Sequence, residues 1–145
     1  MEICTIGFGQ KDAATFFGLL NRAGVKQLLD IRLNNMSQLA GFTKRSDLPF
    51  FLEKICGAAY QHELLLAPTK EMLDAYRKDG GSWAEYEQGF LALMAERQVE
   101  TALAPALFER PTVLLCSEPT AEKCHRRLAA EYLQRKWKGV SVSHL

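Results

Sequence analysis

The sequence predicts an α/β fold, a single three-layer domain with a largely parallel sheet and helices on both faces. Short apolar runs typical of buried strands alternate along the chain with segments whose apolar residues recur at helical spacing. Such alternation is typical of parallel strands joined by helical crossovers. The chain has no internal repeat, low-complexity tract or linker, so residues 1–145 are expected to form one domain.

The first strand and the first helix have clear boundary signals. The run ICTIG (3–7) suits a buried strand, because it is short, apolar and followed by glycines. Asp12 is a preferred residue for capping a helix, which is expected to run to about Ala23. Gly24 then ends that helix.

The later elements continue the alternation. Ser82 and Glu85 form a capping box that opens a long helix with an apolar stripe through Met94. Pro119 suits the first turn of the helix expected after the fourth strand. In chain order, the later predicted elements are a strand at 25–32, a helix at 48–57, a strand at 58–62, a helix from 69 to 80, the capped helix from 83, a strand at 112–116, a helix at about 120–137 and a strand at 140–145.

Composition excludes two classes of protein. A formal net charge of +1 is not that of a generally polycationic nucleic-acid binder. The opening MEICTIGFG is not a signal peptide, and no apolar run approaches the roughly 20 residues needed to span a bilayer. We therefore expect a cytoplasmic protein with no membrane partner, whose four cysteines are reduced thiols.

Side chains suited to chemistry gather where predicted strands end. In open α/β sheets, ligands bind outside the carboxyl ends of the strands. A buried core alone does not explain such clustering, so we infer a site at this edge of the sheet. The residues concerned are Asp30, Arg32, Asn34, Asn35, Ser37 and Gln38 after the second strand, His62 after the third, and Cys116 and Glu118 after the fourth, with His125 and Arg126 on the following helix.

Several of these strings resemble one protein family. TIG, LLDIR with LNNMSQLAGF, LLCSE, CHRRLAAEYL and the terminal HL are similar to the bacterial and archaeal family called domain of unknown function 488. The match runs from end to end, and the paired C-x-E and C-H-R signature makes it specific. The resemblance implies a small cytosolic α/β domain and no settled activity. Many members have a His after the opening Thr-Ile-Gly, where this chain has Phe8.

The cysteines allow two interpretations. Cys116 ends an apolar strand and is either a core residue or a nucleophile, because helix amides and arginines nearby would stabilise its thiolate. Cys124 shares a helical stripe with Leu128 and Tyr132, so we expect it to be buried. Asp30 and Arg32 point the same way on their strand, so they either form a structural ion pair or join the site.

The sequence offers partial signals for three other kinds of site. The cysteines and histidines lack the spacing of a zinc site, so we expect no metal and no cofactor. Gly7 and Gly9, with Asp30 further along, partly match a dinucleotide-binding fingerprint, although its third glycine position is Asp12. The third kind of site is a nucleic-acid-binding surface, because the basic residues of segment 120–138 could bind phosphates.

These observations predict a polar pocket for a small anionic ligand, a phosphate, carboxylate or nucleotide. If the protein is an enzyme, Cys116 is the expected nucleophile, with Glu118 and His125, or His62, as acid–base groups. Arg32, Arg126 and the amides after Cys116 would hold the anion. The alternative is a non-catalytic nucleic-acid-binding module that uses the basic segment. The expected substrate-binding residues are Asp30, Arg32, Asn34, Asn35, Ser37, Gln38, His62 and Arg126.

Overall fold

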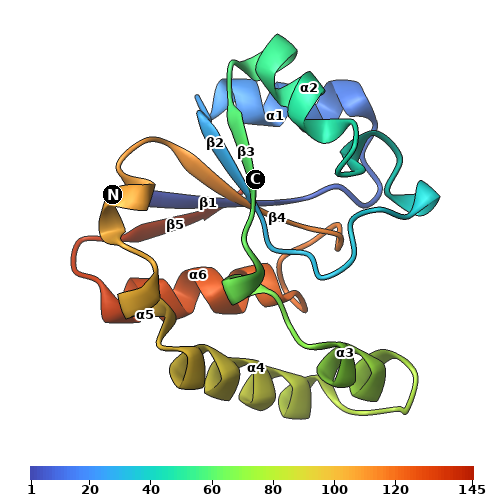
Figure 1. Cartoon of the computed structure of the whole chain (residues 1–145), viewed down its shortest axis with the longest axis vertical. Helices are drawn as coiled ribbons and strands as arrows, with labels where there is room; N and C mark the ends of the chain where they lie inside the picture. The colour runs from blue at the N-terminus through green and yellow to red at the C-terminus, as the bar shows by residue number, and fades with distance from the viewer.

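The computed structural model describes residues 1–145 and contains one five-stranded sheet (Figure 1). All strand pairs are parallel, in the order β3-β2-β4-β1-β5. The predicted class, one α/β domain with a parallel sheet, is confirmed. The strands are β1 (Glu2–Gly7), β2 (Gln27–Asp30), β3 (Ala59–His62), β4 (Thr112–Cys116) and β5 (Ser141–His144).

Helices cover both faces of this sheet (Figure 1). On one face lie α1 (Ala13–Arg22) and α2 (Leu48–Phe51), which continues as a π-helical turn over Leu52–Cys56. On the other face lies α6 (His125–Lys136), and α4 (Trp83–Arg97) packs against it with α3 (Lys70–Arg77) beside α4. The remaining short helices are α5 (Val99–Ala102) and 3-10 turns at Gln38–Thr43, Leu64–Leu66 and Pro105–Phe108.

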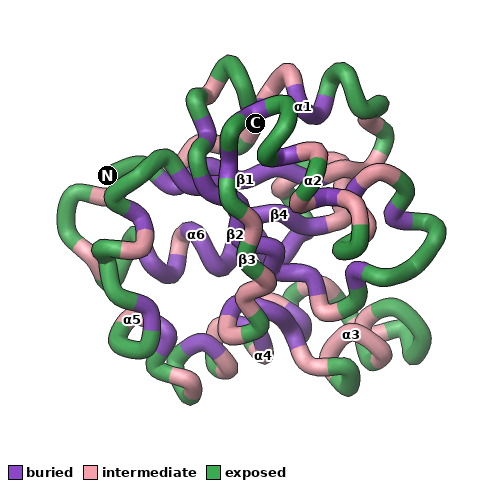
Figure 2. Tube along the Cα trace, turned by 45° about the horizontal axis from the view of Figure 1, so that its top comes forward, coloured by how far each residue is buried: buried purple, intermediate pink, exposed green.

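Two apolar clusters, one on each face, form the core. Successive side chains of a strand point to opposite faces, so Val113 and Leu115 of β4 enter one cluster and Leu114 enters the other. The central strands β1 and β4 are therefore buried along almost their whole length, as is most of α6 (Figure 2). In contrast, α3 has no buried residue and remains at the surface.

Two predicted helix starts are confirmed in atomic detail. The Asp12 carboxylate accepts a hydrogen bond of 2.7 Å from the Thr15 amide at the start of α1. The Ser82 hydroxyl accepts one of 3.1 Å from the Glu85 amide at the start of α4. Gly24, with a φ of 67°, ends the first helical segment as expected.

The predicted start of the last helix is wrong. We expected it near residue 120, but α6 begins at His125, and residues 117–124 form a loop. Two carbonyls at the start of this loop are held by distant donors. The Ser117 carbonyl accepts the Gly9 amide at 3.0 Å, and the Glu118 carbonyl accepts Arg126 Nη1 at 2.6 Å. With their carbonyls held in this way, residues 117–124 do not form a helix, and the loop brings Cys124 into contact with Cys116.

Candidate functional site

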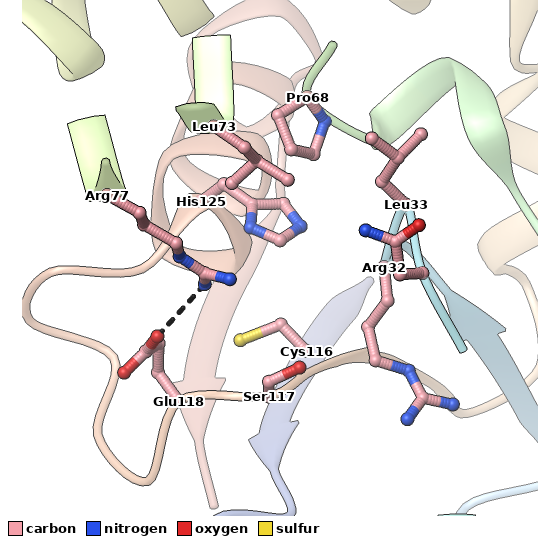
Figure 3. A pocket seen from close by; sticks show the side chains of 10 residues that line it. Arg32, Leu33, Pro68, Leu73, Arg77, Cys116, Ser117, Glu118 and His125 are labelled. Atoms are coloured by element: carbon pink, nitrogen blue, oxygen red, sulfur yellow. Dashed lines mark hydrogen bonds and ion pairs between the residues drawn. The ribbon is translucent and has the colours of Figure 1, made fainter. Parts of the chain in front are cut away.

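A small cavity lies at the carboxyl ends of β2 and β4, beside α3 and the start of α6 (Figure 3). Its volume is about 40 Å³, which is close to the space that one water molecule occupies. Cys116 Sγ points into the space between His125 and the Arg77–Glu118 pair (Figure 3). The lining residues are Arg32, Leu33, Asn34, Pro68, Leu73, Arg77, Cys116, Ser117, Glu118 and His125.

A larger groove of about 240 Å³ adjoins this cavity, and the two share Leu33, Asn34, Leu73 and Arg77. The groove is also lined by Lys70, Lys78 and Asp74, so three cations face one carboxylate. Asp74 pairs with Lys70 at 2.9 Å and with Lys78 at 3.5 Å, but such exposed pairs are weak. We call this the basic groove, and its positive charge suits an anion.

Cys116 and Cys124 form a disulfide, so the expectation of four reduced thiols is wrong for these two. Both are buried, as expected for Cys124, which however lies at the end of the loop rather than on a helical stripe. Cys4 and Cys56 are free and buried in the core on the other face. Burial, with Glu2 nearby, raises the pKa of Cys4 to about 11, and burial also raises the pKa of Cys56. These two thiols are therefore unreactive.

Arg126 contacts both sulfurs of the pair from inside the protein. Its side chain is only 1% exposed, and none of the ion pairs in the molecule includes it. Nη1 lies 3.2 Å from Cys116 Sγ, 3.8 Å from Cys124 Sγ and 2.6 Å from the Glu118 carbonyl. Nε donates to the Thr5 hydroxyl at 3.2 Å. Burial lowers the pKa of Arg126 to about 10, as expected for a cation without an anionic partner.

His125 is buried beside Cys116 Sγ and is neutral at pH 7. Its Nε2 donates to the Ile31 carbonyl at 2.7 Å, and burial lowers its pKa to about 4. Nδ1 makes no hydrogen bond in the protein, whereas every fully buried side-chain nitrogen or oxygen has a partner. Nδ1 is therefore accessible from the cavity and acts there as a hydrogen-bond acceptor.

Asp30 and Arg32 form a buried ion pair at 2.8 Å, which is the first of the two roles predicted for them, a structural ion pair. Nη1 and Nη2 of Arg32 also donate one hydrogen bond each to Thr43, and the guanidinium lies over the Phe8 ring and points away from Cys116 (Figure 3). Burial raises the pKa of Asp30, but hydrogen bonds and the Arg32 charge outweigh burial and lower it below its usual value. Four of the five N–H donors of the Arg32 guanidinium are thus used within the protein, and one Nη1 hydrogen is left for a ligand.

The other expected binding residues are spread around this network. Asn34 lines both the cavity and the basic groove. Asn35 donates to Asp30, and His62 Nε2 bonds the Arg32 carbonyl at 2.7 Å. Ser37 and Gln38 lie outside the cavity, where Ser37 caps a 3-10 turn and Gln38 accepts a hydrogen bond from Lys44. The sequence analysis placed these residues correctly at the strand ends. It did not distinguish the residues that line the cavity from those that hold the lining residues in place.

Arg77 is the important residue that sequence reasoning missed. It lies on α3, and its Nη2 contacts the Glu118 carboxylate at 3.2 Å across the cavity mouth (Figure 3). The two side chains are 53% and 44% exposed, so this ion pair contributes at most about 1 kcal/mol and an anion can displace Glu118. The sequence did contain a signal for Arg77. The helix predicted from Thr69 follows a strand end and carries Lys70, Arg77 and Lys78, which could have indicated an anion site.

The glycines of the partial dinucleotide fingerprint have a structural explanation in this fold. A Cβ atom at Gly7 would meet the Glu118 carbonyl and Arg126 Nη1, and one at Gly9 would lie 2.7 Å from the Ser117 carbonyl. These glycines therefore have a packing role, since they allow the loop after β4 to lie directly against the end of β1.

The basic segment does not form one continuous surface. Arg126 is buried, and Arg127 pairs with Glu131 at 3.2 Å. Lys123 lies before α6, whereas Arg135, Lys136 and Lys138 are exposed at its other end. Most of the helix between them is buried against the sheet and α4. No three His, Cys, Asp or Glu side chains gather in a way that suits a metal ion.

Comparison with known proteins gives one match. The model of a family described as Domain of unknown function DUF488 matches residues 12–133, a range that contains Arg77, both site cysteines and Arg126. No curated protein and no solved structure matches the chain significantly. None of the helices has the length and apolar character required to cross a membrane.

Proposed function

The chain belongs to the DUF488 family, and we propose that it is a thiol-dependent enzyme acting on a phosphate- or carboxylate-bearing substrate, with Cys116 as the nucleophile. One observation carries the proposal. Arg126 is a buried cation without a carboxylate partner, and its Nη1 lies 3.2 Å from Cys116 Sγ. A buried charge is costly unless it is paired, so the thiolate of reduced Cys116 is the natural counter-ion.

The other groups divide the remaining tasks. Arg77, with Lys70 and Lys78, holds the anionic part of the substrate in the basic groove, where Glu118 gives way to it. His125 accepts a hydrogen bond through Nδ1 and remains uncharged, because its pKa is about 4. The thiol proton passes to solvent before the substrate binds. The chemistry needs the reduced cysteine pair, and we place the protein in the cytoplasm, where thiol reductants maintain that form.

Alkylation of the fully reduced protein tests this proposal. Iodoacetate carries a carboxylate and iodoacetamide does not, and mass spectrometry identifies which cysteine each reagent labels. We expect Cys116 to be labelled at least about tenfold faster than Cys4 and Cys56, and to retain most of its rate at pH 6, where an unperturbed thiol is protonated. Arg77→Gln is expected to slow iodoacetate and to leave the iodoacetamide rate unchanged.

The matched control is Arg22→Gln. Arg22 is exposed on α1, which covers the opposite face of the sheet, so its loss is expected to change neither rate. Equal labelling of Cys116 and the two core cysteines would overturn the proposal. A steep dependence of polynucleotide binding on salt, together with an inert Cys116, would instead favour the nucleic-acid-binding alternative.

A further inference from the structure

We propose that this site reduces small carboxylate-bearing disulfides, with Cys116 as the attacking thiol and Cys124 as the thiol that resolves the intermediate. This inference rests on the proposed function and names its substrate class. It assigns a catalytic task to Cys124, which a reaction with one nucleophile does not need. It also explains why the loop 117–124 returns a second cysteine to Cys116.

The two sulfurs are both buried, but they line different recesses and lie at different distances from the charge. Cys116 lines the cavity that adjoins the basic groove, whereas Cys124 lines a neighbouring recess of about 20 Å³ that shares Leu73, Arg77, Glu118 and His125 with the cavity but does not include the lysines of the groove. Arg126 Nη1 is 3.2 Å from Cys116 Sγ and 3.8 Å from Cys124 Sγ. Cys116 is therefore the better stabilised thiolate and faces the substrate. Cys124 lies behind it, within reach of the same sulfur.

The shape and charge of the site select the substrate class. A cavity of about 40 Å³ admits only a narrow group to Cys116 Sγ. An unbranched CH₂–S–S–CH₂ chain meets this requirement, whereas a tetrahedral phosphoryl group is bulky at the atom under attack. The carboxylates of such a disulfide would lie in the basic groove beside Arg77, Lys70 and Lys78.

The reaction balances without any group other than the disulfide. The Cys116 thiolate attacks one substrate sulfur, which forms a mixed disulfide and releases the other half of the substrate as a thiolate. Cys124 then loses its proton to solvent and attacks Cys116 Sγ, which forms the Cys116–Cys124 bond and releases the second half. Two electrons pass from the cysteine pair to the substrate, which becomes two thiols. An external dithiol returns the pair to its reduced form.

Oxidised glutathione, a disulfide with carboxylates, is the probe. With the reduced protein we expect two thiols released per chain, no lasting adduct and a Cys116–Cys124 disulfide in the mass map. Cys124→Ser is expected to release one thiol and to retain a mixed disulfide on Cys116, and Cys116→Ser to do neither. Cystamine, whose ends are cationic, should react at least about tenfold more slowly, and Arg77→Gln should reduce that difference, because only Lys70 and Lys78 then remain in the groove.

The outcomes separate this inference from the proposed function. A lasting adduct on Cys116 in both the unchanged protein and Cys124→Ser would exclude Cys124 as the resolving thiol. A Cys116 that reacts with iodoacetate but not with oxidised glutathione would exclude the substrate class and leave the nucleophile in place. Cys124→Ala, checked by circular dichroism with Cys124→Ser, shows whether either change disturbs the fold. If both variants fold and neither traps an adduct, the inference is wrong.

Discussion

Asp30 organises the support of the site although it does not line the cavity. Its carboxylate accepts two hydrogen bonds of 2.8 Å from Arg32, one of 2.6 Å from the Tyr60 hydroxyl and one of 3.0 Å from Asn35. Arg32 in turn holds Thr43 of the segment after β2. A single buried carboxylate thus joins three segments at the strand end, and its removal leaves a buried guanidinium without an anion.

We therefore expect Asp30→Asn to lower the free energy of unfolding by about 3–5 kcal/mol, the cost of breaking a buried ion pair from one side. Tyr60→Phe removes the hydrogen bond to the same carboxylate and the one that the hydroxyl accepts from Asn35, which keeps its bond to Asp30, and the change should cost about 2 kcal/mol. Urea unfolding at pH 7 measures both. Similar losses for the two variants would show that the Asp30–Arg32 pair contributes little.

His125 makes stability depend on pH because burial lowers its pKa from 6.5 to about 4. Between these values the unfolded chain binds a proton that the folded protein does not, so stability falls as the pH falls through this window. From these two pKa values, the loss between pH 7 and pH 5 is about 2 kcal/mol. The loss continues through the folded-state pKa of about 4 and levels off roughly one pH unit below it, where both states are protonated.

Urea unfolding of His125→Gln at pH 7 and pH 5 checks this expectation. The glutamine amide can still donate to the Ile31 carbonyl but does not titrate, so the variant should lose less stability on acidification. His144→Gln is the comparison variant: the pKa of His144 is also lowered, mainly by burial, but this residue is more exposed, so its replacement should reduce the loss of stability on acidification by less than His125→Gln does. An unchanged pH dependence in His125→Gln would contradict the assignment of a neutral, buried imidazole.

The loop after β4 and the end of β1 fit together only because two glycines lie between them. A methyl group at Gly7 would collide with the Glu118 carbonyl and with the guanidinium that contacts Cys116. Neither group can move aside easily, because the Glu118 carbonyl belongs to the backbone and the Arg126 side chain is fully buried. The backbone of the loop would have to move.

Gly7→Ala is therefore expected to destabilise the protein by about 1–3 kcal/mol, the usual cost of overpacking, and to slow the alkylation of reduced Cys116. Gly18→Ala is the matched control. Its new methyl would find only the end of the Arg22 side chain at 3.5 Å, and alanine is the better helix former, so α1 should gain up to about 1 kcal/mol. If both variants have the same stability as the unchanged protein, the packing of β1 against the loop is looser than described.

The elements that the sequence predicted well are those with local causes. The strands are contiguous apolar runs, and the caps at Asp12 and Ser82 depend on residues three positions apart. The prediction for the start of α6 was wrong because two hydrogen bonds hold the preceding segment in a loop. Gly9, far away in the sequence, donates to the Ser117 carbonyl, and Arg126, on the far side of the loop, donates to the Glu118 carbonyl. Arg77 was missed because its place at the cavity depends on how α3 packs.

At the scale of the whole molecule, burial falls from the centre of the sheet to its edges. β4 is buried throughout and β1 almost so, whereas the edge strands β3 and β5 contain only exposed and half-buried residues. The cavity lies beside β2 and β4, near the centre, whereas the basic groove is formed partly by the surface helix α3. A rigid nucleophile is thus combined with a more mobile binding surface.

Native-state hydrogen exchange should reproduce this gradient. We expect the amides of β1 and β4 to exchange only through global unfolding, and those of β3, β5 and α3 through smaller openings with lower free energies. The protection of individual strands in dilute denaturant measures these values. Equal protection across the five strands would mean that the sheet opens as one unit.

The strand order also determines when the protein can fold. Gly7 of β1 pairs with Cys116 of β4, and the opposite edge of β1 pairs with β5, near the end of the chain. No neighbouring strands are joined by a hairpin, since every pair is parallel. During synthesis, the apolar first strand therefore waits without a partner until β4 has left the ribosome. Such distant pairing is associated with slow folding, and a growing chain with a waiting strand of this kind benefits from a chaperone.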